Sequence, residues 1–208
     1  MAGCAHDPCT PFDGRSTWYR GALLAVIGIN AAMFIIEVTA GLGAGSQALL
    51  ADALDFAGDA ATYGITLWAI GRPLRTRATA ALLKSASLAL MALWVLASTA
   101  WQLLVLGLPR AEVMGAVGLL AFAANLASVL ILVRWKDGDA NVRSVWLCSR
   151  NDALGNLAVI GAAGAVWVTA SAWPDLLVAA AIAGLFLSSA VTIIRQASAE
   201  RRRTRVAA

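Results

Sequence analysis

The sequence predicts an all-α membrane protein with six transmembrane helices, and its composition, its apolar runs and its loop charges each support this prediction. Of 208 residues, 60% are hydrophobic and 13% are charged, whereas about a quarter of the residues are charged in soluble domains. The apolar residues gather in runs of about twenty, which is the length that a helix needs to cross a hydrocarbon core of roughly 30 Å. Backbone amides in lipid need internal partners, so these runs are predicted to be helical.

Six such runs follow one another along the chain with short loops between them. The predicted spans cover residues 21–40, 47–70, 85–108, 113–133, 144–173 and 176–194. Short loops make successive helices antiparallel neighbours. The predicted organisation is a cytoplasmic tail of residues 1–17, a transmembrane domain of residues 18–196 and a basic cytoplasmic tail of residues 197–208. No soluble domain is expected, because the tails are too short to bury a core.

Basic residues determine the predicted orientation, because cytoplasmic loops retain Lys and Arg. With the N-terminus inside, 14 of the 16 basic residues lie in cytoplasmic segments, and only Arg110 and Arg150 do not. Both termini are therefore predicted to be cytoplasmic, in a plasma or inner membrane. This asymmetry also accounts for the net charge of +4, so binding of nucleic acid is not implied.

Acidic residues inside the second predicted span are the main functional signal, because a charge at the bilayer centre costs at least about 2.5 kcal/mol. Asp52, Asp55 and Asp59 are spaced i, i+3 and i+7, which places them on one face of a helix. Two ionised carboxylates one turn apart repel, so a cation, a proton or a basic neighbour must compensate them. A divalent metal meets this requirement through oxygen ligands.

The fifth predicted span supplies a matching pair, Cys148 and Asp152, which are also one helical turn apart. Together with Asp55 and Asp59 they offer four ligands of the kinds that zinc and softer metals accept in tetrahedral geometry. The sequence therefore predicts a metal site between the second and fifth helices.

Two further charged residues are expected to support this site. Glu37 lies toward the outer end of the first span, where it either serves the site or is a structural residue near a helix end. Arg150 is two residues before Asp152 and is expected on the opposite side of the helix. It either pairs with Asp52 or reaches the cytoplasmic interface.

The polar N-terminal tail lacks the pattern of a signal peptide. It contains Cys4, His6 and Cys9, which either capture a soft metal before delivery or belong to an unstructured tail. Disulfides are not expected, because the tail faces the reducing cytoplasm.

The chain resembles the cation diffusion facilitator transporters over about residues 18–196. The second-helix signature of that family is similar to residues 45–59, which read GSQALLADALDFAGD. Further similarity lies in Asn30, Glu37 and Gly41, in residues 148–160, and in the Trp-Pro-Asp run at 173–175. The resemblance implies a six-helix homodimer, not an enzyme, that exports Zn²⁺, Cd²⁺, Co²⁺ or a related ion, commonly in exchange for protons. No cofactor is expected besides the transported ion.

The transport-site pattern of the family, carried onto this sequence, falls on Asp55, Asp59, Cys148 and Asp152. Cys148 stands where the family has His, and its thiolate favours softer ions such as Cd²⁺ or Hg²⁺. The resemblance covers neither the cytoplasmic C-terminal domain nor the His-rich loop of longer members, so metal sensing and the usual dimer contacts are in doubt.

Three alternative functions each make a demand on the sequence. A lipid phosphotransferase would require Asp-Gly and Ala-Arg, which do not occur near Asp59. A non-transporting metal sensor or accessory protein would use the same ligands, and only a flux measurement separates it from a transporter. An exporter of organic cations would need aromatic walls, whereas the tryptophans lie mostly toward span ends, as in an interfacial belt.

Overall fold

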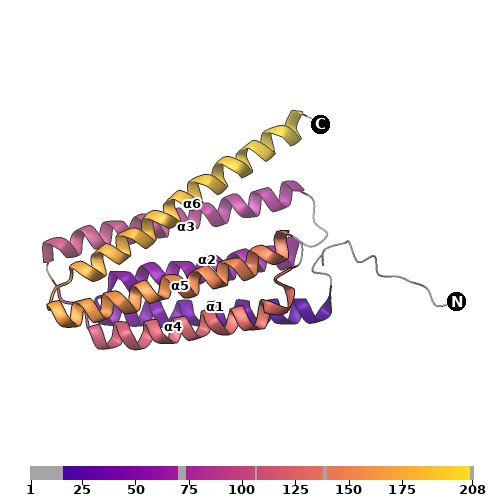
Figure 1. Cartoon of the computed structure of the whole chain (residues 1–208). Helices are drawn as coiled ribbons and strands as arrows, with labels where there is room; N and C mark the ends of the chain where they lie inside the picture. Colours follow the sequence, from indigo (N-terminus) through magenta and orange to yellow (C-terminus); the bar gives the residue numbers. More distant parts are fainter. Residues whose placement is uncertain (1–15, 70–73, 106, 138–139, 207–208) are drawn as a thin grey trace.

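The computed structural model is a bundle of long helices joined by short connections (Figure 1). It describes residues 16–69, 74–105, 107–137 and 140–206. Within these residues no strand occurs and six α-helices are present. The predicted all-α fold with six helices is therefore confirmed.

The helices follow the order of the predicted spans, but several extend beyond the apolar runs. They are α1 (Thr17–Ala44), α2 (Gln47–Ala69), α3 (Leu74–Val105), α4 (Ala111–Leu132), α5 (Ala140–Thr169) and α6 (Trp173–Val206), with a 3₁₀ turn, η1 (Val133–Trp135), after α4. The basic segment predicted as a tail continues α6 as far as Val206. Arginine and alanine favour helix, so the helix need not stop where the apolar run ends.

Three of the helical segments are long and apolar enough to cross a membrane by themselves, when only the described residues are considered. They are Thr17–Ala44, Ala111–Trp135 and Ser149–Thr169, and shorter apolar stretches occur at Ala89–Gln102 and Trp173–Ser188. Helix α2 contains three aspartates, of which Asp52 and Asp59 are buried against neighbouring helices and Asp55 is partly buried. The bundle is consistent with a polytopic membrane protein.

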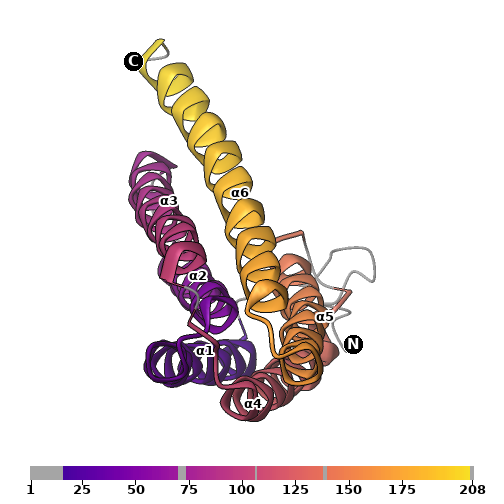
Figure 2. The same cartoon turned by 90° about the vertical axis from the view of Figure 1, so that its left-hand side faces the viewer.

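The helices pack chiefly in pairs, α1 on α2, α4 on α5 and α3 on α6. Figures 1 and 2 show that α1, α2, α4 and α5 run alongside one another, whereas α3 and α6 are inclined to them. Glycine permits the closest approaches. A Cβ at Gly41 would lie 3.0 Å from Leu50 Cγ, and one at Gly118 would lie 3.2 Å from Ile160 Cγ1. Small residues at such crossings let helices pack tightly without a solvent-driven core.

Asp175, in the first turn of α6, connects α6 to the start of α2 by hydrogen bonds. Its fully buried carboxylate accepts hydrogen bonds from Ser46 Oγ (2.6 Å), from the backbone N–H of Gln47 (2.8 Å) and from the backbone N–H of Ala48 (3.0 Å). A helix start leaves its first N–H groups without partners inside the helix. A residue of α6 therefore caps α2.

A second group of hydrogen bonds ties α3 to the same end of α2. The Gln47 side chain donates to Gln102 Oε1 (2.7 Å) and accepts from Ser98 Oγ (2.6 Å). Gln102 in turn donates to the carbonyl of Gly45 (2.6 Å), which ends α1 in the left-handed conformation (φ 67°). Helices α2, α3 and α6 are thus fixed to one another at this end of the bundle.

Candidate metal centre

Three of the four predicted ligands meet at the middle of the bundle. Asp55 and Asp59 come from one face of α2, and Asp152 comes from α5. One carboxylate oxygen from each residue lies within 4.8 Å of the other two. At that separation, ionised carboxylates repel by about 3 kcal/mol per pair in a medium of effective dielectric constant 20. The group is therefore suited to hold a cation or bound protons.

A cavity of about 380 Å³ opens beside these carboxylates, between α2, α5 and α6. Asp55 and Asp152 are partly exposed to it, and Asp152 Oδ2 has no hydrogen-bond partner. The cavity is lined by Asp52, Asp55, Asn151, Asp152, Gly155, Ile182, Leu185 and Phe186. Its acidic side comes from α2 and α5, and its apolar side comes from α6. The carboxylates of Asp55 and Asp152 thus line a space in which an ion could contact both of them.

The sequence itself identifies the family. Residues 23–200 match the cation efflux transmembrane domain. This chain belongs to the cation efflux family. The match includes all three converging carboxylates and extends from α1 into α6. A comparison with curated proteins returns no significant match.

Membership of the cation efflux family makes this a membrane protein whose domain transports metal cations, and the family consists of transporters and not of enzymes. The fold and the family thus agree with the resemblance that the second-helix and fifth-helix motifs indicated.

Tyr63 and Ser149 complete the surroundings of one carboxylate in this cation efflux protein. The Tyr63 hydroxyl donates a hydrogen bond to Asp59 Oδ2 and lies 3.3 Å from Ser149 Oγ on α5. Both side chains are fully buried. They were not predicted as site residues, although the four-residue step from Asp59 to Tyr63 places both on one face of α2. Tyr63 therefore orients one candidate ligand.

Glu37 and Asp52 form a second acidic contact, between α1 and α2. Glu37 is fully buried and Asp52 is 4% exposed, and the Glu37 carboxyl group faces that of Asp52. Neither Glu37 oxygen nor Asp52 Oδ2 has a hydrogen-bond partner. Of the alternatives left open for Glu37, a place at the helix end does not apply, because Glu37 lies two turns inside α1 and is fully buried. The pair lies next to the three carboxylates without joining them.

Arg150 lies outside the candidate metal centre. Its side chain is exposed, its guanidinium lies 5.4 Å from the ring centroid of Trp146, and Nη2 donates to Asn151 Oδ1 (3.3 Å). No salt bridge to Asp52 is present among the described residues. Of the two alternatives for this residue, pairing with Asp52 is wrong, because Arg150 is exposed and lies about 200° around α5 from Asp152, which faces α2.

Four predicted ligands fall outside what the structure describes. Cys148 belongs to α5, one turn before Asp152, but its side chain is not among those described. The tail residues Cys4, His6 and Cys9 precede the first described residue, Ser16. Their roles stay predictions.

Proposed function

We propose that this cation efflux family member exports a divalent cation of the zinc class, such as Zn²⁺, Cd²⁺ or Co²⁺, in exchange for protons. The observation that supports it best is the approach of Asp55, Asp59 and Asp152 to within 4.8 Å from two helices beside an open cavity. Three carboxylates on helices form a preorganised site for a small ion, because helices position ligands more precisely than loops do.

Cys148 is the fourth ligand in this proposal. It precedes Asp152 by four residues in the sequence, and this spacing predicts that the two residues share one face of a helix. A thiolate prefers softer ions than an imidazole does. The proposed order of preference therefore places Cd²⁺ at or above Zn²⁺.

Proton exchange follows from the chemistry of the ligands. Carboxylates and a thiolate bind metal only when deprotonated, so an ion that enters from the cytoplasm releases protons from them. Protons from the other side then compete the ion off. Tyr63 keeps Asp59 oriented through this cycle, in the manner of outer-shell partners that fix metal ligands. We place the protein in a plasma or inner membrane with both termini cytoplasmic, as a homodimer.

The direct test is metal-driven proton flux into liposomes that contain the purified protein, followed with a metal-sensitive and a pH-sensitive dye. Asp59→Ala is expected to abolish both signals, because it removes a central ligand. Glu112→Ala is the matched control, since Glu112 is an exposed acid in the first turn of α4. Unchanged flux in Asp59→Ala would reject the site. Metal binding without flux in the unaltered protein would favour the sensor alternative.

The ligand role of Cys148 has its own test. Cys148→His is expected to shift the ratio of Cd²⁺ to Zn²⁺ transport toward Zn²⁺, because imidazole is the harder donor. Val168→His, at an exposed position of the same helix, is the control for an imidazole introduced elsewhere in the chain. If the ratio is the same in all three proteins, Cys148 does not bind the ion.

A further inference from the structure

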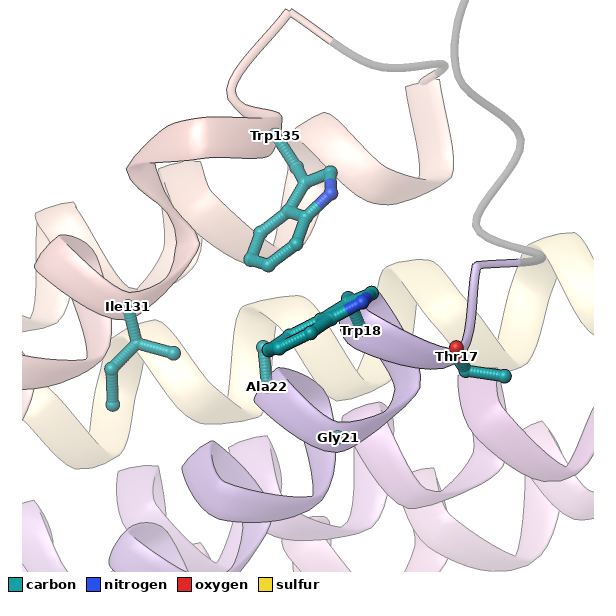
Figure 3. A pocket seen from close by; sticks show the side chains of 6 residues that line it. All are labelled: Thr17, Trp18, Gly21, Ala22, Ile131 and Trp135. Atoms are coloured by element: carbon teal, nitrogen blue, oxygen red, sulfur yellow. The ribbon is translucent and has the colours of Figure 1, made fainter.

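A groove of about 480 Å³ lies at the end of the bundle where α1 begins and α4 ends (Figure 3). Four residues of α1 line it, together with Ile131 of α4 and Trp135 of η1. The α1 residues are Thr17, Trp18, Gly21 and Ala22. Figure 3 shows the two indole rings on opposite sides of the opening. The groove is separate from the candidate metal centre and shares no residue with it.

The groove is built into the fold. Trp135 packs edge-on against Tyr19, with ring centroids 5.5 Å apart and ring planes at 69°. Tyr19 is buried in a cluster with Leu23 and Leu132, and Trp135 packs against this cluster. Gly21 leaves room at the floor, since a Cβ there would meet nothing within 4 Å. An apolar chain can therefore enter without displacing these core side chains.

The same helical turns carry charge at their exposed positions. Arg20, Arg134 and Lys136 are exposed, and Asp137 is the exposed acid beside them. None of these three basic residues forms a salt bridge within the part of the chain that the structure describes. The described residues of the rim therefore carry two net positive charges, three basic residues less one acidic residue. Paired tryptophans with basic residues are typical of the membrane–water interface.

We infer that the Trp18–Trp135 groove binds one anionic phospholipid, with an acyl chain between the indole rings and the phosphate near Arg20, Arg134 and Lys136. Trp18 is 81% exposed, so its indole ring is accessible to a lipid acyl chain. The net charge of the rim selects an anionic over a zwitterionic headgroup, because clustered basic residues attract anionic lipid. This inference does not depend on the proposed transport of metal.

The test measures retention of added dioleoyl phosphatidylglycerol and dioleoyl phosphatidylcholine by the purified full chain, using native mass spectrometry. Each basic residue near anionic lipid contributes about fivefold, so two net charges predict a preference for phosphatidylglycerol of about 25-fold. The variant Arg20→Gln/Arg134→Gln keeps Lys136 and Asp137, whose charges cancel, and is therefore expected to lower this preference to about one.

A second pair of variants tests the groove itself. Gly21→Leu fills it and is expected to remove one retained lipid. Gly28→Leu is the matched control, because Gly28 lies seven residues along the same helix, is exposed, and also has open space at its Cβ. It is expected to retain lipid as the unaltered protein does. Equal retention of the two lipids by the unaltered protein would overturn the inference, as would full retention by Gly21→Leu.

Discussion

Replacement of Asp175 by alanine is expected to destabilise the bundle more than replacement of any exposed acid. Asp175 is fully buried, and its carboxylate is the partner of two backbone N–H groups and one hydroxyl at the start of α2. Alanine leaves the N–H groups of Gln47 and Ala48 buried without that acceptor. Ser46 keeps its contact with the N–H of Leu49 (3.2 Å), so part of the helix start survives.

The size of the effect follows from these contacts. A buried N–H left without a partner costs about 1–3 kcal/mol. Two such N–H groups lower the free energy of unfolding by about 4 kcal/mol. Removal of the buried Asp175 carboxylate offsets part of this loss, because the charge no longer has to be desolvated. The expected loss is therefore about 3 kcal/mol. In a chain of this length each kcal/mol shifts Tm by about 2–4 °C, which predicts a fall of about 9 °C.

The assay is thermal unfolding in detergent, followed by the fluorescence of the eight tryptophans. Asp175→Asn keeps one acceptor oxygen and is expected to lower Tm by about half as much. Glu112→Ala, an exposed acid in the first turn of α4, is expected to change Tm by less than about 2 °C. A Tm for Asp175→Ala that equals the Glu112→Ala value would show that the cap does not hold α2.

Three further predictions concern the site and its packing. Tyr63→Phe is expected to weaken metal binding about 10–100-fold, measured by calorimetry, because it removes the hydroxyl that orients Asp59. Glu37→Gln is expected to raise Tm by about 3 °C. The amide can donate a hydrogen bond to the Asp52 carboxylate, and it carries no charge that could repel Asp52. Gly118→Val is expected to cost about 1–3 kcal/mol, seen as a lower Tm, because even its Cβ would lie 3.2 Å from Ile160 Cγ1.

Each of these predictions has a matched control. Tyr19→Phe alters a buried tyrosine outside the site and should leave metal affinity unchanged. Glu112→Gln neutralises an exposed acid and should leave Tm unchanged. Gly115→Val adds the same side chain one turn before Gly118, where a Cβ meets Ala163 Cβ at an ordinary 3.8 Å. If a variant behaves like its control, the contact from which its effect was predicted does not have the role assigned to it.

The six helices were predictable because long apolar runs determine the spans, and loop glycines and prolines separate them. Helix ends were less predictable, since α6 continues through basic residues to Val206 whereas the apolar run ends near residue 194. Helix propensity extends a helix past the apolar run, and hydropathy does not report propensity.

The convergence of Asp55, Asp59 and Asp152 was predicted from their one-turn spacings, since only one face of each helix carries them. Tyr63 was not predicted, because a tyrosine in an apolar run gives no signal until its neighbours in space are known. Asp175 was noted as part of the Trp-Pro-Asp run, but its role as the cap of α2 was not predicted. Its partners lie 127–129 residues away in the chain, and no local pattern connects them.

Helices α3 and α6 are inclined to the other four helices (Figure 2), and the apolar wall of the cavity and its carboxylates come from different helices. Helix α6 supplies one wall of the cavity but none of the three carboxylates. Asp175 caps α2 from the first turn of α6, and farther along α6 Ala179 and Ala183 lie in one buried cluster with Leu50 and Leu54 of α2. In the proposed exporter, the apolar wall of the cavity and the carboxylates that bind the ion thus come from different helices, so a substitution in the α6 wall can change the size of the cavity without removing a ligand.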